Sequence, residues 1–544
     1  MRTILLAALY LLLQCSLPAQ ENYVISIRTD KEAVAPGIFE PNLASLQKYK
    51  VPEWFRNAKF GIWAHWGPQC QPGQGDWYAR NMYWQGSNTY NWHVKNYGHP
   101  SKFGFKDVIN SWKAEKWDPE KLVALYKRAG AQYFFAMANH HDNLDMWDSK
   151  YQPWNTVNVG PRKDILAGWA EAAKKQGLPL GLSVHAAHAW SWFETAQQSD
   201  REGEFAGIPY DGRLTAADAK GTWWEGLDPQ ELYAQHHPLS TGSESIHGIH
   251  KLWNWEKGVA IPSQEYCEKF YNRTMDLINR FQPDLLYFDD TFLPLYPISD
   301  AGLKIAAHYY NNSMARNNGA LKAVLFGKVL TDEQKKYVVW DVERGAPDKI
   351  QELAWQTCSC IGEWHYKNAL FEENRYKPAR EVIHTLVDIV SKNGNLLLNI
   401  PVKGDGSIDD KEIAVLEGIA RWMDINKESI FNTRPWKIFG EGPAADAANP
   451  INAQGFNEGK IKFSSKDIRF NQDGNILYVT VLGVPTEDVV VRALGTSGGG
   501  QKIKKIELLG SKEKIKWKQH ADGLKIKKPK TAPNDIALVF KIRL

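Results

Sequence analysis

The sequence predicts an α/β fold, a (β/α)8-like barrel, followed by a small antiparallel β-sandwich. Between residues 59 and 400, short apolar runs typical of buried strands alternate with segments of helical periodicity. Polar residues follow nearly every one of these strands, which favours a closed barrel over an open sheet. After Trp436 the pattern changes to short β-branched and apolar runs with partial alternation, as in an antiparallel sheet.

The composition is that of a globular protein without a large charge imbalance. The chain has 544 residues, of which 43% are hydrophobic and 24% are charged, with a net charge of +4. Such a small charge argues against a nucleic-acid partner. The 23 tryptophans are unusual, and flat indole rings suit the stacking of sugars, although core packing will account for most of them.

Residues 1–20 are predicted to be a secretory signal peptide. Arg2 gives the charged start, residues 4–13 form the apolar core and Ala19 ends a plausible cleavage site. This core is too short to span a bilayer, so we expect no integral membrane span. Cys15 follows a loose lipoprotein-like pattern in which Gln14 fits poorly. We therefore expect an exported protein, periplasmic or secreted, with lipoprotein anchoring at Cys15 less favoured.

The four other cysteines are too few to form a disulfide framework in a chain of this length. Two of them, Cys358 and Cys360, are too close in sequence to bridge easily, and a C-x-C pair without further ligands is weak evidence for a metal. We expect all four to be free: Cys70, Cys267, Cys358 and Cys360.

The repeated units run in order through the first four hundred residues. The predicted strands cover residues 59–65, 132–138, 178–184, 285–288, 324–326, 337–340 and 396–400. The predicted helices cover residues 121–128, 165–175, 266–281 and 379–391. Glycines after several of these segments, such as Gly130 and Gly177, are typical of the turns that end helices.

Three domain ranges follow from this pattern. We expect a signal peptide at 1–20, a catalytic barrel at 21–440 and a β-sandwich at 445–544. A polar, Gly- and His-rich insertion at 195–262 lacks periodicity and is typical of a functional loop or lid. Residues 501–544 hold 13 Lys/Arg against 4 Asp/Glu. A basic patch for an acidic polysaccharide is one interpretation, but a solvated strand face protected by lysines is favoured.

Histidines and carboxylates lie at the predicted strand ends. They are His65, His140, His141, His185, His188, Asp289 and Glu343. A zinc site is one alternative, but side chains alternate along a strand, so His140 and His141 should not both reach one ion, and there is no H-E-x-x-H helix. Neutral imidazoles each offer one donor and one acceptor, which suits a hydroxyl-rich ligand.

Two carboxylates at separate strand ends, surrounded by Trp and His, form the constellation of a glycoside hydrolase. A serine hydrolase is excluded because no G-x-S-x-G motif occurs. No glycine-rich loop stands at a strand–helix junction, which argues against a dinucleotide enzyme. We expect neither a cofactor nor a metal.

Several longer motifs recur together over residues 45–440. They are WFRNAKFGIWAHWG at 54–67, WYARNMY at 77–83, HHD at 140–142, GPRKD at 160–164, LYFD at 286–289, LVDIVSKNGNLLLNIP at 386–401, GDG at 404–406 and TRPW at 433–436. In combination they resemble glycoside hydrolase family 29, the α-L-fucosidases. The resemblance implies a (β/α)8-like barrel, a C-terminal β-sandwich and a retaining mechanism without metal.

By position in these motifs, the resemblance implies that Asp289 is the nucleophile that forms a covalent glycosyl-enzyme. Asp290 is the alternative, and on a continuing strand it would point to the other face. The position of the acid/base varies in the family. Glu343 matches a subgroup pattern and is preferred, with Glu363 as its rival.

The resemblance also implies a set of substrate-binding residues: His65, Asp76, Trp77, His140, His141, His185 and Tyr287. Some of them depart from the family pattern. Tyr287 replaces the usual Trp, Asp76 stands where many members have Glu, and His185 stands where Tyr is common. Lys328 lies roughly where an Arg can occur.

The expected function is that of an exo-acting, retaining α-L-fucosidase that removes terminal α-L-fucose from oligo- or polysaccharides by double displacement. L-Fucose is 6-deoxy-L-galactose, and one polar exchange near C6 shifts preference by about 1–3 kcal/mol. An α-L-galactosidase acting on algal galactans is therefore an alternative. A non-catalytic carbohydrate-binding protein on a hydrolase scaffold is the other.

Overall fold

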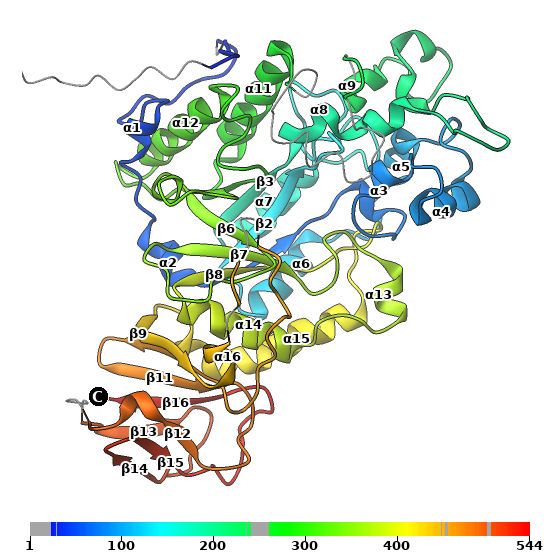
Figure 1. Cartoon of the computed structure of the whole chain (residues 1–544). Helices are drawn as coiled ribbons and strands as arrows, with labels where there is room; N and C mark the ends of the chain where they lie inside the picture. Colours follow the sequence, from blue (N-terminus) through cyan, green and yellow to red (C-terminus); the bar gives the residue numbers. More distant parts are fainter. Residues whose placement is uncertain are drawn as a thin grey trace, which may run out of the picture.

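The computed structural model shows a barrel ringed by helices, with smaller sheets packed beneath it (Figure 1). It describes residues 23–28, 30–234, 237–240, 261–447, 449–451, 455–497 and 502–544. The predicted signal peptide and Cys15 lie outside the described residues. None of the described helices is long and apolar enough to cross a membrane.

Eight parallel strands close into a barrel in chain order, with β1 paired to both β2 and β8. The strands are β1 (Phe60–Ala64), β2 (Tyr133–Asn139), β3 (Leu180–Val184), β4 (Leu285–Phe288), β5 (Val324–Gly327), β6 (Val339–Glu343), β7 (Trp355–Cys360) and β8 (Gly394–Asn399). The predicted barrel is confirmed, and its strands are buried on both faces because helices cover the outside.

Helices lie around the barrel and on the loops at its strand ends (Figure 1). They are α1 (Leu43–Leu46), α2 (Glu53–Ala58), α3 (Tyr78–Asn81), α4 (Asn88–Tyr97), α5 (Phe105–Ser111), α6 (Pro119–Arg128), α7 (Ile165–Lys175), α8 (Ala189–Trp192), α9 (Pro229–Tyr233), α11 (Gln264–Phe281), α12 (Ala301–Arg316), α13 (Asn368–Glu372), α14 (Ala379–Ser391), α15 (Asp410–Asn426) and α16 (Pro443–Asp446). Side-chain caps fix several starts: Asp164 accepts from the Ala167 amide at 2.8 Å, and Ser263 accepts from the Tyr266 amide at 3.2 Å.

Strand β7 was not among the predicted strands, because its sequence WQTCSC is poor in hydrophobic residues. Its polar side chains find partners inside the barrel instead of water. Gln356 Nε2 donates to Asp341 Oδ2 at 2.8 Å, and the Tyr133 hydroxyl donates to Gln356 Oε1 at 2.9 Å. Strand β6 also lies later than predicted, so Glu343 is its last residue.

The C-terminal region forms two antiparallel sheets, in the orders β13-β16-β11-β10-β9 and β12-β15-β14. Their strands are β9 (Arg434–Glu441), β10 (Ile468–Asp473), β11 (Ile476–Val481), β12 (Val489–Val491), β13 (Lys505–Leu508), β14 (Trp517–His520), β15 (Gly523–Ile526) and β16 (Leu538–Arg543). Residues of both sheets, such as Phe470 and Leu524, share one apolar core. The predicted sandwich is thus confirmed.

The boundary between the two regions needs a correction. The sequence placed the end of the barrel domain at 440 and the start of the sandwich at 445. However, β9 pairs with β10, so the C-terminal sheet already begins at Arg434. Pro435 obscured this strand in the sequence, and it is tolerated because β9 lies at the edge of the sheet.

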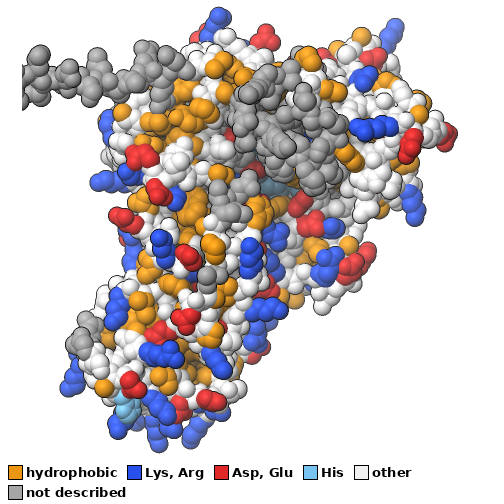
Figure 2. Space-filling model, in the orientation of Figure 1, with side chains coloured by type: hydrophobic (Ala, Val, Ile, Leu, Met, Phe, Trp, Pro, Cys, Tyr) orange, Lys and Arg blue, Asp and Glu red, His pale blue; other side chains and the backbone are white. Residues whose placement is uncertain are grey.

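Lysines point outward from the small C-terminal strands. Lys505, Lys518 and Lys525 are exposed, while Ile506, Leu508 and Leu524 are buried. Figure 2 shows Lys and Arg side chains gathered at this end of the molecule. This arrangement is that of the solvated strand face favoured by the sequence.

The insertion predicted at 195–262 packs against the loops of the barrel over its described residues. Asp211 accepts hydrogen bonds from the hydroxyls of Tyr83 and Tyr233, both at 2.6 Å, and pairs with Lys106 at 3.2 Å. All of these groups are buried. Residues 241–260 lie outside the described part of the chain. Cys70, Cys267, Cys358 and Cys360 are buried and free, as predicted.

Candidate active site

A pocket of about 370 Å³ lies at the C-terminal ends of the barrel strands. It is lined by Trp63, His65, Asp76, Trp77, His140, His141, His185, His188, Tyr287, Asp289, Asp290, Thr291, Lys328, Val329, Glu343, Arg344, Trp364 and Phe456. All nine predicted site residues are among them, although they come from five different strand ends. This is the end of the barrel where active sites form in such folds.

Asp289 follows β4 and is surrounded by donors. Its Oδ1 accepts from Lys328 Nζ at 2.7 Å, and its Oδ2 lies 3.2 Å from both His141 Nε2 and His185 Nδ1. Burial alone would raise the pKa of this carboxyl, but the Lys328 charge and the two histidines hold the pKa of Asp289 well below its usual range. Asp289 is therefore ionised at neutral pH, as a nucleophile must be.

Lys328 joins the two candidate catalytic carboxylates. Its Nζ also contacts Glu343 Oε2 at 2.8 Å. Burial would lower the pKa of this lysine, but the charges of Asp289 and Glu343 raise the pKa of Lys328 well above its usual value. Because both contacts end on one nitrogen, the two carboxylate oxygens lie at most the sum of the two distances, about 5.5 Å, apart.

The alternative carboxylates have other partners. Asp290 also lines the pocket, but its Oδ1 lies 3.3 Å from His188 Nε2 and accepts from the Thr291 amide at 2.6 Å. Glu363 pairs with Lys367 at 2.6 Å and is absent from the described residues that line the pocket. The geometry thus favours Asp289 and Glu343 as the reacting pair.

Three buried histidines meet at the bottom of the pocket. The ring of His65 lies 5.2 Å from that of His140 and 5.1 Å from that of His185, between centroids. Burial holds the pKa of His65 and of His140 well below the usual value and lowers that of His185 to about 4. Within the described residues, neither nitrogen of His65 has a hydrogen-bond partner. These neutral rings suit hydroxyl groups.

The sequence argument against convergence of His140 and His141 was wrong. Nitrogens of His140, His141 and His185 lie within 4.8 Å of one another, as do those of His65, His140 and His365. Strand β2 ends at Asn139, so both residues lie past the strand, where side chains no longer alternate. Nitrogens of His141 and His185 lie 3.2 Å from Asp289, and His65 and His140 line the same pocket, so we interpret these rings as its hydroxyl-binding wall.

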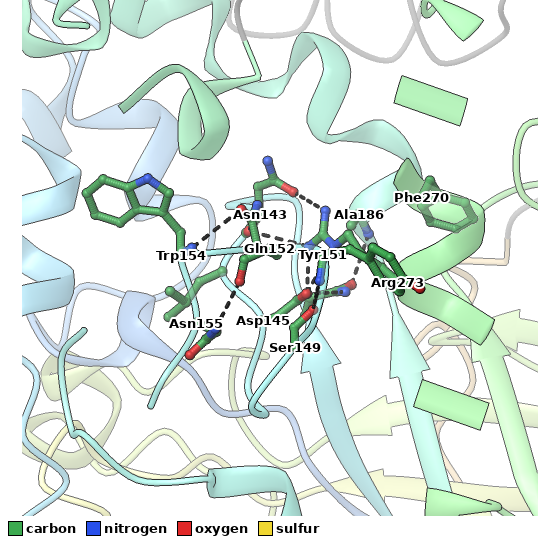
Figure 3. Close-up of polar contacts among 12 residues, drawn as sticks. Asn143, Asp145, Ser149, Tyr151, Gln152, Trp154, Asn155, Ala186, Phe270 and Arg273 are labelled. Carbon is green, nitrogen blue, oxygen red and sulfur yellow. Dashed lines mark hydrogen bonds and ion pairs between the residues drawn. The ribbon is translucent and has the colours of Figure 1, made fainter. Parts of the chain in front are cut away.

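A buried network fixes the loops that carry these histidines. Asn139 Oδ1 accepts from the His185 amide at 3.1 Å, and its Nδ2 donates to Asp145 Oδ1 at 2.9 Å. Arg273 of α11 donates to both oxygens of Asp145, at 2.6 and 3.0 Å, and to Asn143 at 2.6 Å. Figure 3 shows Arg273 directed at this loop. Helix α11 thus holds the end of β2 against the end of β3.

Aromatic rings and one further acid complete the pocket. The ring of Trp63 lies 5.2 Å from Tyr287 and 5.6 Å from Trp364. Asp76 accepts from the amides of Trp364 and His365, at 3.2 and 2.7 Å, so it anchors the loop after β7. Asp76 lies at the pocket, as predicted, but its carboxylate also accepts hydrogen bonds from the loop after β7.

Lining residues that the sequence did not assign to the site include Lys328, Arg344, Trp364 and Phe456, and His365 lies against His65 and His140. Lys328 had a usable signal, since it follows a predicted strand and its position was noted as one where Arg can occur. Trp364 and His365 follow β7, the unpredicted strand. Phe456 comes from the segment between α16 and β10 of the C-terminal region, and nothing in its local sequence marks it.

Comparisons with known proteins agree with this geometry. A family model described as alpha-L-fucosidase matches residues 26–428, and a model of the alpha-L-fucosidase C-terminal domain matches residues 462–543. The chain is 24% identical to tissue alpha-L-fucosidase of Rattus norvegicus over 516 residues, which cover 92% of this chain and 90% of that protein. It is 22% identical to alpha-L-fucosidase of Dictyostelium discoideum over 410 residues, covering 74% and 76%.

The fold is also that of solved structures. An alpha-fucosidase of Thermotoga maritima in complex with fucose matches with a TM-score of 0.66 at 24% identity, over 93% of this chain and 100% of that one. Alpha-L-fucosidase isoenzyme 1 from Paenibacillus thiaminolyticus matches with a TM-score of 0.60 at 18% identity, over 92% and 99%. The first family model spans more than half of the sequence, and the motifs had predicted the same family. The chain therefore belongs to the α-L-fucosidase family of glycoside hydrolases.

Proposed function

We propose that this protein is an exo-acting, retaining α-L-fucosidase that removes terminal α-L-fucose from glycans by double displacement. The observation that carries the proposal is the separation of Asp289 and Glu343, whose nearest oxygens lie at most about 5.5 Å apart across Lys328. Carboxyl groups about 5–5.5 Å apart are typical of retaining glycosidases, whereas inverting enzymes need room for a water.

The two steps follow from these positions. Asp289 attacks the anomeric carbon while Glu343 donates a proton to the departing oxygen, which leaves a glycosyl ester on Asp289 and an alcohol. Glu343, now ionised, then takes a proton from water, which attacks the same carbon and releases Asp289. The neutral histidines bind the hydroxyls of the sugar, and Trp63 and Tyr287, which lie within the barrel strands, form the floor of the pocket.

An α-L-galactosidase is the second candidate, and one observation favours it. Trp63 Nε1 and His185 Nε2 are buried in the pocket and have no hydrogen-bond partner among the described residues. With the Trp63 indole N–H facing C5 of the sugar, a methyl group there would leave this donor without a partner, whereas the hydroxymethyl group of L-galactose would accept from it. Family membership supports fucose, so the fucosidase is the first proposal.

Kinetics measured in parallel on 4-nitrophenyl α-L-fucoside and 4-nitrophenyl α-L-galactoside test both candidate functions, the fucosidase and the galactosidase. A fucosidase should show at least a roughly tenfold higher kcat/KM on the fucoside, and NMR should show the α-anomer as the first product. A preference for the galactoside supports the second candidate. Binding of either sugar without turnover would instead support a carbohydrate-binding protein, and a β-anomer would contradict the retaining mechanism.

Glu343→Ala tests the acid/base. The variant should lose most activity on glycosides with poor leaving groups, since no proton reaches the departing oxygen. On 4-nitrophenyl α-L-fucoside, whose leaving group departs without a proton, sodium azide should restore turnover, because this anion attacks the glycosyl-enzyme without needing a general base, and the glycosyl azide should keep the α-configuration. Glu363→Ala is the matched control, since that side chain pairs with Lys367, accepts from the Asp76 amide at 3.3 Å and does not line the pocket. If azide rescued Glu363→Ala and did not rescue Glu343→Ala, Glu363 would be the acid/base.

A further inference from the structure

We propose that Phe456 forms a binding site for the leaving group, a surface on which the ring next to the cleaved sugar stacks. Its ligand is a pyranose of the glycan chain or an aromatic aglycone. The inference rests on the proposed function, because it needs Glu343 to act on the departing oxygen. Phe456 lies outside the barrel sequence, in the segment between α16 and β10.

This segment is bonded directly to the strand that carries the acid/base. The Phe456 amide donates to the Glu343 carbonyl at 2.8 Å, and the Glu458 amide donates to the Arg344 carbonyl at 2.9 Å. Gly455 forms a parallel bridge with Glu343. Its φ is +122°, and a Cβ there would lie 2.0 Å from the Glu343 carbonyl oxygen, so the close approach requires glycine. In Figure 1 the orange chain runs beside β6 and β7.

The two residues after Phe456 hold the segment in place. Asn457 is buried, accepts from the Ala346 amide at 2.9 Å and donates to the Ala346 carbonyl at 3.0 Å. Glu458 accepts from the Ser359 hydroxyl at 2.6 Å and pairs with Lys377 at 2.7 Å. These contacts join the segment to the ends of β6 and β7, so the position of Phe456 is fixed by its neighbours.

The backbone of Phe456 adopts an unfavourable conformation at this position. Its φ of +58° is unfavourable for a residue with a side chain, and 47% of the residue is exposed. Phe456 nevertheless lines the same pocket as Glu343 and Arg344. A strained backbone that is held by buried contacts, and that presents an aromatic ring to solvent beside catalytic groups, is typical of a binding surface.

The side of the pocket on which this ring lies follows from the chemistry. The acid/base must stand beside the oxygen that leaves, whereas the nucleophile stands on the opposite side of the anomeric carbon. Phe456 is bonded through its backbone to the acid/base strand, and its contacts are with β6 and β7. The ring that it faces is therefore attached to the departing oxygen.

Phe456→Ala tests the inference with two substrates that differ in the leaving group. 4-Nitrophenyl α-L-fucoside carries a ring, whereas α-L-fucosyl fluoride carries none and needs no proton from Glu343. The variant should lose about tenfold in kcat/KM on the nitrophenyl glycoside, mainly through KM, and stay within about twofold of the wild type on the fluoride. Phe456→Tyr should restore the nitrophenyl value. Leu353→Ala, which truncates another exposed apolar side chain away from this pocket, should change neither.

Phe456→Gly separates binding from folding. Glycine relieves the positive φ, so this variant should melt no lower than the wild type and still show the selective loss. Equal losses on both substrates, or no loss on the nitrophenyl glycoside, would overturn the inference. If the wild type hydrolyses neither the fucosides nor the matching α-L-galactosides, the proposed function fails instead, and the two failures are distinct.

Discussion

Asp289 keeps its negative charge in a buried site because Lys328, His141 and His185 all face it. Asp289→Asn should therefore lower kcat by at least about 10³-fold while sugar binding stays measurable, since the amide has no charge with which to attack. Kinetics on an activated fucoside and calorimetric titration with fucose measure the two quantities.

Asp290→Asn is the comparison for this variant. Its carboxylate pairs with His188 and with a backbone amide, so the change should leave far more activity than Asp289→Asn. A mechanism-based label, 2-deoxy-2-fluoro-fucosyl fluoride, should modify the peptide that contains Asp289. Near wild-type turnover by Asp289→Asn, or a label on Asp290, would move the nucleophile to the neighbouring residue.

Lys328 is expected to set the acidic limb of the pH profile through its effect on the pKa of Asp289. Its charge depresses the pKa of Asp289, so Asp289 stays ionised into acid solution. In Lys328→Met this effect is lost and the pKa of Asp289 rises, so the acidic limb of kcat/KM should move to higher pH by about 1–3 units. Lys328→Arg keeps the charge and is the control. An unshifted acidic limb in Lys328→Met would show that another group sets it.

At the scale of elements, α11 holds the histidine loops through Arg273 and Asp145. Arg273→Met leaves a buried carboxylate without its cation and should cost about 3–5 kcal/mol of unfolding free energy. KM should also rise, because the ends of β2 and β3 loosen. Arg280→Met on the same helix removes a more exposed pair with Asp164 and should cost at most about 1 kcal/mol. Denaturant unfolding compares them, and equal losses would contradict the argument.

The elements with strong local patterns were predicted well. The apolar periodicity of α7 and the apolar run of β4 gave their observed bounds, 165–175 and 285–288. Strand β7 was missed because buried hydrogen bonds replace hydrophobicity in it. Trp364, His365 and Phe456 were missed because long-range packing brings them to the pocket. Lys328 was noted but not included, since only the folded structure places it between two acids.

At the scale of the whole molecule, a buried ion cluster ties the C-terminal sheet to the barrel. Asp388 of α14 pairs with Arg469 of β10 at 2.6 Å and with Lys392 at 2.7 Å. Arg469 also lies 5.3 Å from the ring centroids of both Phe439 and Phe463. Burial would raise the pKa of Asp388, but the two cations lower it below its usual value. The two domains are thus expected to unfold together.

Asp388→Asn should therefore lower the melting temperature at pH 7. Because the folded-state pKa of Asp388 is depressed, its stabilisation is present above its unfolded-state pKa of about 4 and is lost as the pH falls towards the folded-state value. The difference between variant and wild type should accordingly shrink as the pH falls below about 4. Asp424→Asn, which removes an exposed pair with Arg128, is the control and should change little. A difference that does not depend on pH would exclude this origin.

The return of residues 455–458 to the ends of β6 and β7 means that barrel and sandwich are not interchangeable modules. Replacing the C-terminal sheets with those of another protein would change the residues on one side of the pocket. An insertion after α16 would change which glycans fit without altering any barrel strand. Substitutions in the segment between α16 and β10 can thus alter the pocket while the barrel sequence stays the same.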